Sequence, residues 1–397
     1  MRRVVVVGGS LAAVHAAEAL RERDFDGEIT IISAEQHLPY DRPPLSKEAL
    51  SSGVDVEKLY LRSPQWYEDH AIDVRLGAAA AGLDVTNTVV HLADGTEVPY
   101  EGLVLATGSR ARRLPVVSGL PDAHVVRDIG DAAELREKLR PGKRLLLVGA
   151  GFIGLEIAAT ARQMGVDVSV IEVGRAPLAR ALGDEVGAWF RDLHTRNGID
   201  IVCTCSVERF EATRGGVRAE LSTGDVLDAD IVVGGIGATP NVEWLEGSGL
   251  SVANGVLTGA DLSTGVPGVV AAGDIARWYN PLFDEEMRVE HWTNAVEQGR
   301  HAAHTLLGTS EAYSSVPYFW SDQFTAKMRF VGTGIAATDV VVEDATDTRL
   351  TALYGRDGVI RGAVAVNAPR QLVKYRTAIR DQVPWQEIAP AAISAVR

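Results

Sequence analysis

The stretch KRLLLVGAGFIGLEIAATARQMGVDVSVIE, residues 143–172, decides the fold. An apolar run leads into the glycine-rich segment 149–154. An alanine-rich segment with the composition of a helix follows, and a second apolar run ends at Glu172. Strand, glycine turn, helix and strand make a βαβ unit of the length that a parallel sheet needs. The pattern predicts a Rossmann-like dinucleotide-binding unit.

Each glycine of this G-x-G-x-x-G segment has its own expected task. Gly149 permits the tight turn, Gly151 lets the backbone approach a pyrophosphate, and Gly154 lets the helix pack closely on the strand. The helix N-terminus would face the phosphates, and the Glu172 carboxylate could accept hydrogen bonds from both hydroxyls of an adenosine ribose. The alternative is a tight turn between a strand and a helix that binds nothing.

Residues 2–35, RRVVVVGGSLAAVHAAEALRERDFDGEITIISAE, repeat this order of elements. The glycine motif is altered here: Gly8 is kept, while Ser10 and Ala13 stand where glycines are usual. Both replacements are small, so a close approach of the backbone to a ligand remains possible. Glu35 ends the second apolar run, as Glu172 does in the other copy. The repeat predicts two separate nucleotide-binding domains in one chain.

Short glycine-containing segments end several further strands. Ala106 and Thr107 lie in the segment 105–108, LATG, and a run in the second half ends at Gly237. Gly273 and Asp274 belong to the segment 271–274, AAGD. Asp274 could cap a helix, or it could bind a ribityl hydroxyl while a helix end faces a pyrophosphate.

The rest of the chain completes an α/β architecture. Turns at 94–95 and 223–225 lie between alternating apolar runs, which predicts a β-meander in each half. From residue 317 short strands are followed by helices from about Pro369. We predict two Rossmann-like dinucleotide-binding domains plus a small α+β C-terminal domain.

Composition excludes several classes of function. The 397 residues carry a formal net charge of −14, which disfavours general binding to nucleic acid or to an anionic membrane. No apolar run reaches the roughly 18 residues of a membrane span. The early glycines argue against reading the N-terminus as a signal peptide, so we expect a cytoplasmic protein. The only cysteines, Cys203 and Cys205, would share one face of a strand and suit packing; we expect no metal site.

Two segments carry a more specific resemblance. Residues 37–47, HLPYDRPPLSK, and residues 319–323, FWSDQ, resemble the oxygenase-coupled NADH–ferredoxin reductases, the putidaredoxin reductase type within the glutathione-reductase-like flavoproteins. The order and spacing of the glycine motifs are similar to that family over nearly the whole chain. The resemblance implies non-covalent FAD, NADH as the electron donor, and a [2Fe–2S] ferredoxin that serves an aromatic-ring dioxygenase or a cytochrome P450.

The resemblance also names the domains. It implies an FAD-binding domain made of residues 1–112 and 237–316, an NADH-binding domain of residues 113–236, and a C-terminal domain of residues 317–397, in a monomer or weak homodimer. Dithiol reductases of this fold need a Cys-x4-Cys pair beside the flavin and NADH peroxidases need a single cysteine. The region after Glu35 has none. Electrons would then leave the flavin directly, which suits a one-electron protein acceptor.

The resemblance implies candidate catalytic residues, each with a simpler alternative. It places Lys47 near the flavin, paired with Glu156 beside the nicotinamide, where a cation would stabilise reduced flavin. Glu156 could instead only complement the helix dipole, because it follows Gly154 by two residues on what we expect to be the first helical turn. Lys47 could be an exposed lysine. Trp320 would lie near the flavin edge, or it could be a core residue.

The remaining candidates are cofactor-binding residues. Arg42 and Pro43 lie in the first family segment, and Trp292 lies in the predicted FAD domain. Arg127 matches a family position near the cofactor, although a surface arginine beside Asp128 explains it equally well.

Other functions remain open on this fold. A rubredoxin reductase or a monodehydroascorbate reductase would use the same framework, and an NADH-sensing flavoprotein like apoptosis-inducing factor would not turn over ferredoxin. For the ferredoxin reductase we expect a basic patch that steers an acidic partner. Arg300, Lys327 and Arg329 are its candidates, with ordinary solvated side chains as the alternative.

Overall fold

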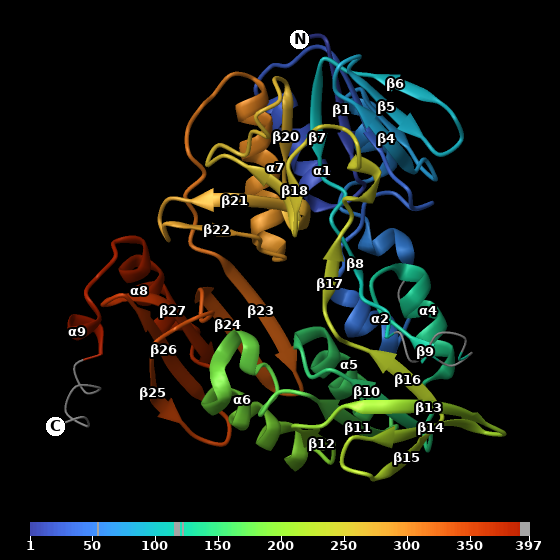
Figure 1. The fold of residues 1–397 in the computed structure, drawn as a ribbon, viewed down its shortest axis with the longest axis vertical. Coiled ribbons are helices and arrows are strands. Elements are labelled where there is room, and N and C mark those ends of the chain that lie inside the picture. Colours follow the sequence, from blue (N-terminus) through green and yellow to red (C-terminus); the bar gives the residue numbers. More distant parts are fainter. Residues whose placement is uncertain (54, 115–119, 121–122, 390–397) are drawn as a thin grey trace. The chain divides into compact units, whose positions relative to one another are not determined.

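The computed structural model describes residues 1–53, 55–114, 120 and 123–389. The chain divides into two compact units (Figure 1). Unit 1 comprises Met1–Asp41, Asp55–Arg110 and Thr239–Pro317. Unit 2 comprises Arg42–Val54, Ala111–Ala238 and Tyr318–Arg397. Each of the two βαβ repeats lies in its own unit.

A five-stranded parallel sheet forms the centre of unit 1, in the order β20-β7-β1-β2-β3. Its strands are β1 (Arg3–Val7), β2 (Glu28–Ile32), β3 (Ile72–Arg75), β7 (Gly102–Leu105) and β20 (Val269–Ala271). They are mostly apolar because both faces of such a sheet are covered. Helix α1 (Leu11–Glu22) follows β1 and packs against α7 (Trp292–Leu306), where a Cβ on Gly299 would lie 2.4 Å from the Ala12 carbonyl oxygen.

Two smaller sheets complete unit 1. The first is the antiparallel meander β4 (Ala80–Asp84), β5 (Val89–Leu92) and β6 (Glu97–Pro99), whose last turn holds Gly95 at φ +87°. The hairpin predicted there is confirmed. The second sheet contains β18 (Val252–Ala253), β19 (Gly255–Thr258), β21 (Ala276–Asn280) and β22 (Glu285–Met287). The short helices are η2 (Val56–Leu59), α3 (Pro64–Asp69), η4 (Glu243–Leu245) and η5 (Gly273–Ile275).

Unit 2 repeats the parallel arrangement, with the order β12-β11-β10-β16-β9. Its strands are β9 (Ala123–His124), β10 (Arg144–Val148), β11 (Asp167–Glu172), β12 (Asp200–Cys203) and β16 (Ile231–Gly234). The helices are α4 (Ile129–Lys138), α5 (Phe152–Gln163) and α6 (Ala179–Arg196), the last interrupted at Gly183. In both units the first strand of the repeat pairs with the second and with the strand after the meander, so the predicted repeat is confirmed.

The meander of unit 2 covers its parallel sheet. It contains β13 (Val207–Thr213), β14 (Gly216–Leu221) and β15 (Val226–Ala229), and the predicted turn joins β14 to β15. The prediction that the two cysteines share one strand face is wrong. β12 ends at Cys203 because Thr204 adopts φ +55°, and Cys205 turns into the core beneath the meander with 1% exposure.

The C-terminal part of unit 2 is an antiparallel sheet in the order β23-β24-β27-β26-β25. Its strands are β23 (Tyr318–Gln323), β24 (Ala326–Gly332), β25 (Asp339–Ala345), β26 (Leu350–Arg356) and β27 (Val359–Val366). Helices α8 (Pro369–Arg380) and α9 (Trp385–Ile388) follow. The predicted α/β class with a small α+β C-terminal part is confirmed.

One short segment joins unit 2 from within the range predicted for the FAD-binding domain. Residues 42–54 contain η1 (Pro43–Ser46) and α2 (Glu48–Ser51). Thr160 of α5 donates a hydrogen bond of 2.9 Å to the Ser46 carbonyl oxygen, which fixes the segment to the helix of the second βαβ repeat. The chain later leaves unit 1 through β8 (Ser109–Ala111) and returns through β17 (Ala238–Pro240).

Candidate functional site

In the turn between β1 and α1, position 8 has space for glycine only. Gly8 has φ +129°, and a Cβ there would lie 2.0 Å from the carbonyl oxygen of Ala106, just after β7. Ser10 is the N-cap of α1, but its side chain caps no backbone N–H, and Ala13 is fully buried beneath the turn. The Thr107 hydroxyl donates to the Asn241 carbonyl at 2.9 Å. The small side chains leave the N-terminal N–H groups of α1 available to an anion.

Polar groups surround this turn at the ends of neighbouring strands. Glu35 follows β2 and accepts a hydrogen bond of 2.5 Å from the Tyr40 hydroxyl. Asp274 lies in η5, where its carboxylate accepts from the Ser109 hydroxyl at 2.8 Å. Asp274 therefore does not cap a long helix, because α7 begins only at Trp292, whose indole N–H donates to Asp41 at 2.8 Å.

The turn between β10 and α5 has the backbone geometry that its three glycine positions predict. Gly149 has φ +98°, and a Cβ on Gly154 would lie 2.7 Å from the Gly149 carbonyl oxygen. A Cβ on Gly151 would meet nothing closer than 3.8 Å, so the outer side of the turn is open. Gly237, beyond β16, has φ +97° with no atom within 4 Å of a Cβ. These turns fit dinucleotide pyrophosphates in both units.

The Glu172 carboxylate is fixed at the second turn by two backbone donors. The Ala150 N–H donates to Oε2 and the Gly174 N–H donates to Oε1, each at 2.7 Å. Glu172 therefore holds the tip of the glycine turn against the end of β11. A fixed anion at this position suits two ribose hydroxyls, which can donate hydrogen bonds to it, and disfavours an additional phosphate.

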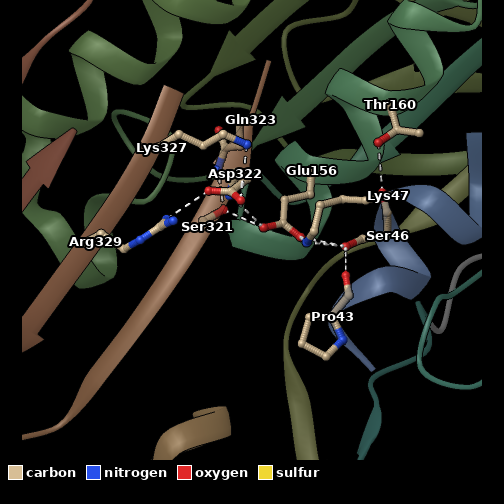
Figure 2. A network of polar contacts seen from close by, with 10 residues as sticks. All are labelled: Pro43, Ser46, Lys47, Glu156, Thr160, Ser321, Asp322, Gln323, Lys327 and Arg329. Atoms are coloured by element: carbon tan, nitrogen blue, oxygen red, sulfur yellow. Dashed lines mark hydrogen bonds and ion pairs between the residues drawn. The ribbon is translucent and has the colours of Figure 1, made fainter. Parts of the chain in front are cut away.

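Lys47 and Glu156 form a half-buried ion pair at the centre of a polar network (Figure 2). The Lys47 Nζ and the Ser46 hydroxyl each lie 2.6 Å from Oε2 of Glu156. The Ser321 hydroxyl donates to Oε1 at 2.7 Å, and the Asp322 N–H donates to the same oxygen at 3.2 Å. The segment 42–54, helix α5 and strand β23 thus meet at one carboxylate.

The position of Glu156 differs from the predicted one. Gly151 is the N-cap of α5, so Glu156 is the fifth helical residue and the first turn contains no acidic residue. The helix-dipole effect acts mainly within the first turn, so complementation of the dipole does not explain this side chain. Glu156 is 7% exposed and saturated with donors, which indicates a built polar site.

The network continues beyond Glu156 to a buried histidine. The Gln323 amide nitrogen donates to the Ser321 hydroxyl at 3.0 Å, and its oxygen lies 2.8 Å from Nε2 of His194 on α6. Burial lowers the pKa of His194 to about 4, although the hydrogen bond to Gln323 opposes this shift. His194 is therefore neutral at pH 7.

This buried histidine predicts acid sensitivity. The unfolded chain binds a proton at His194 below about pH 6.5, while the folded chain does so only near pH 4, so stability falls as pH decreases through this window. Between pH 7 and pH 5 the expected loss is about 2 kcal/mol. Urea unfolding at both pH values should show a smaller loss in His194→Gln. His91→Gln, at an exposed ring, is the control; an equal loss in wild type and His194→Gln would contradict the prediction.

Unit 2 also contains the predicted residues Arg42, Pro43, Arg127 and Trp320. A guanidinium nitrogen of Arg42 donates to the Arg127 carbonyl oxygen at 2.6 Å, and the Arg127 N–H donates to Asp131 at the start of α4. Pro43 begins η1. Trp320 is half-buried on β23, where its ring lies 6.3 Å from that of Tyr318.

The three candidate docking cations all have acidic partners. Lys327 and Arg329 pair with Asp322 at 3.3 and 2.9 Å. In unit 1, Arg300 pairs with Glu18 and Glu22. Two cations facing one carboxylate leave a local excess of positive charge at Asp322, whereas the charge of Arg300 is compensated.

Sequence reasoning assigned no role to several residues of the network. Ser46, Ser321 and Gln323 lie within the two segments that carry the resemblance, so a signal was present. Nothing in the sequence around His194 connects it to Gln323, 129 residues later. Among the described residues no cluster of His, Cys, Asp and Glu could hold a metal ion, and no helix is long and apolar enough to cross a membrane.

Comparisons with known proteins identify the relatives of this chain. The sequence signature of the family described as pyridine nucleotide-disulphide oxidoreductase matches residues 2–299, and that described as reductase C-terminal matches residues 318–394. The ferredoxin–NAD(+) reductase component of the anthranilate 1,2-dioxygenase system of Burkholderia cepacia is 41% identical over 94% of this chain and 93% of that protein.

Two further matches cover the same length. Rhodocoxin reductase of Rhodococcus erythropolis is 38% identical over 96% of this chain and 90% of that protein. Among solved structures, the reductase in the covalent putidaredoxin reductase–putidaredoxin complex superimposes with a TM-score of 0.92 at 33% identity, covering 96% of this chain and 94% of that one.

Proposed function

Because the chain belongs to the pyridine nucleotide-disulphide oxidoreductase family, with a reductase C-terminal domain, we propose that it is an FAD-dependent NADH–ferredoxin reductase. It passes electrons one at a time to a [2Fe–2S] ferredoxin that serves an aromatic-ring dioxygenase or a cytochrome P450. One named relative is the ferredoxin–NAD(+) reductase component of a dioxygenase system, and another is rhodocoxin reductase. We place the reaction in the cytoplasm, where NADH is available.

The observation that carries this proposal is the position of the cysteines. Cys203 ends β12 in unit 2, Cys205 lies beyond that strand in the core, and the glycine turn of unit 1 has no cysteine near it in the sequence. The first repeat and the segment that follows it therefore supply no thiol that could relay electrons from the flavin. That arrangement suits direct electron transfer to a one-electron protein acceptor.

The proposed cofactor sites follow the two turns. In unit 1 the FAD-binding residues are Gly8, Ser10, Ala13, Glu35, Ala106, Thr107, Gly273, Asp274 and Trp292. In unit 2 the NADH-binding residues are Gly149, Gly151, Gly154, Glu156, Glu172 and Gly237, and we further assign Arg42, Pro43, Lys47, Arg127 and Trp320 to the cofactor site. At Gly8 the backbone is too close to Ala106 for any side chain, and at Gly151 the outer side of the turn is open. Both turns therefore lack a side chain that would keep a pyrophosphate away from the backbone.

The chain's own residues supply position and charge. When bound, FAD takes an electron pair from NADH and can release it singly, which no side chain here does. Lys47 provides a fixed cation, and Glu156 holds its ammonium group in one place. The Ser46 and Ser321 hydroxyls and the Asp322 N–H donate to the Glu156 carboxylate and hold it in one orientation.

The direct experiment reconstitutes the purified chain with flavin and measures NADH-dependent reduction of candidate [2Fe–2S] ferredoxins. We expect a yellow protein that releases FAD on denaturation and sustained turnover with at least one ferredoxin. Rubredoxin and monodehydroascorbate serve as competing acceptors. Binding of FMN alone would contradict the cofactor assignment. A stable NADH-reduced protein that transfers no electrons to ferredoxin would indicate a sensor instead.

A further inference from the structure

A line of hydrogen bonds leads from the core of unit 2 to the Lys47–Glu156 pair. It runs from His194 on α6 through Gln323 and Ser321 on β23 to Oε1 of Glu156. Gln323 has no exposed surface, and Ser321 is 1% exposed. Bulk water therefore does not compete for either side chain, and the hydrogen bonds form one connected buried network.

The orientation of the Gln323 amide sets the direction of these hydrogen bonds. Its oxygen faces Nε2 of His194 and its NH₂ group faces Ser321, so the neutral imidazole donates from Nε2 to that oxygen. The Ser321 hydroxyl accepts from that NH₂ group and so uses its own proton toward Glu156. With the amide reversed, the Gln323 oxygen would compete with Glu156 for this proton.

The far end of the line is the carboxylate that fixes Lys47. Oε1 of Glu156 receives Ser321 and the Asp322 N–H, while Oε2 receives Lys47 and Ser46. If Ser321 turns away, Oε1 keeps only the longer contact of 3.2 Å, and the carboxylate can rotate away from Lys47.

We infer that Gln323 is a positioning residue, whose amide, oriented by His194, directs the Ser321 hydroxyl onto Glu156 and so holds the Lys47 ammonium group in place. The inference rests on the proposed function only for its kinetic consequence, because the order of the ion pair can be measured without NADH. Gln323 itself touches no reacting group in this assignment.

The first test measures the Lys47 amine in the FAD-loaded enzyme without NADH. Lys47 is 20% exposed, so acetic anhydride can label it, with exposed Lys58 as the internal standard. We expect Gln323→Met to raise the Lys47/Lys58 labelling ratio about threefold or more, because a loosened carboxylate protects the amine less. Tyr354→Phe removes another buried hydrogen bond of unit 2, from Tyr354 to the Leu182 carbonyl, and should leave the ratio unchanged.

In the Gln323→Met variant the imidazole N–H of His194 loses its acceptor, and this unpaired buried group would lower the stability of the folded protein. The double variant His194→Phe with Gln323→Met removes both partners and avoids that cost. We expect the same rise in Lys47 labelling in this protein. An unchanged labelling ratio in both variants would overturn the inference.

The second test uses the limiting rate of flavin reduction at saturating NADH. Gln323→Met should lower this limiting rate about tenfold, which corresponds to the loss of one hydrogen bond. In the Glu156→Gln background the same substitution should have no further effect on the rate. An equal slowing in both backgrounds would mean a general structural role and would refute the inference. If Glu156→Gln alone leaves the rate unchanged, the proposed role of Glu156 fails, while the labelling ratio still decides whether Gln323 positions the pair.

Discussion

Glu156→Gln is expected to slow the reduction of bound flavin by NADH by about 100-fold while FAD stays bound. All four partners of the carboxylate are donors, and two of them, Lys47 and the Asp322 N–H, cannot accept. These two lie on different oxygens, so either orientation of a glutamine amide directs its NH₂ group at one of them. The substitution therefore removes the charge that fixes Lys47 and leaves a buried donor unsatisfied.

Stopped-flow reduction at saturating NADH measures this effect, and the flavin spectrum after gel filtration checks FAD content. Lys47→Met keeps the side-chain length without the cation, and the two variants form a double-mutant cycle. If the ion pair acts as a unit, the double variant is about as slow as the slower single one. Strictly additive losses would mean that the two charges act separately.

We expect the wild-type enzyme to prefer NADH over NADPH by roughly 100-fold in kcat/KM. A 2′-phosphate would sit beside the Glu172 carboxylate, which the Ala150 and Gly174 N–H groups prevent from swinging away. Two unit charges about 4 Å apart repel by roughly 4 kcal/mol at an effective dielectric of 20, and salt reduces this. Arg175 could reduce the preference by attracting the phosphate.

Steady-state kinetics with both nucleotides measure the preference, with Glu172→Gln as the variant. Removing the Glu172 charge should lower the ratio of kcat/KM for NADH to kcat/KM for NADPH, chiefly by raising kcat/KM for NADPH. Some loss with NADH is also expected, because a glutamine cannot accept from both N–H groups and the glycine turn loosens. Equal kcat/KM values for NADH and NADPH in the wild-type enzyme would refute the role of Glu172.

The sequence predicts those features whose causes are local. Gly8 and Gly149 follow apolar strands directly and adopt the positive φ that a tight turn needs, so the βαβ units could be located from composition and order alone. The strand break at Thr204 could not be predicted, because a residue of ordinary strand propensity adopts a left-handed conformation while Cys205 enters the core.

The surroundings of Glu156 also depend on tertiary structure. Its partners come from positions 109 to 166 residues away, and no periodicity connects them. The pairing with Lys47 could be expected only from the resemblance to a family. The start of α5 explains why Glu156 does not act on the helix dipole as the alternative proposed. The helix begins at Phe152, before Gly154, and this places Glu156 in its second turn.

The assignment of residues 42–54 to unit 2 limits how this protein can be divided or recombined. A fragment of residues 113–236 would contain Glu156 but neither Lys47 and Ser46 nor Ser321 and Asp322. Its central carboxylate would lose every donor at once. Exchange of the nucleotide-binding module between related reductases must therefore transfer all three stretches of unit 2 together. The segment that has to be exchanged is larger than the sequence repeat suggests.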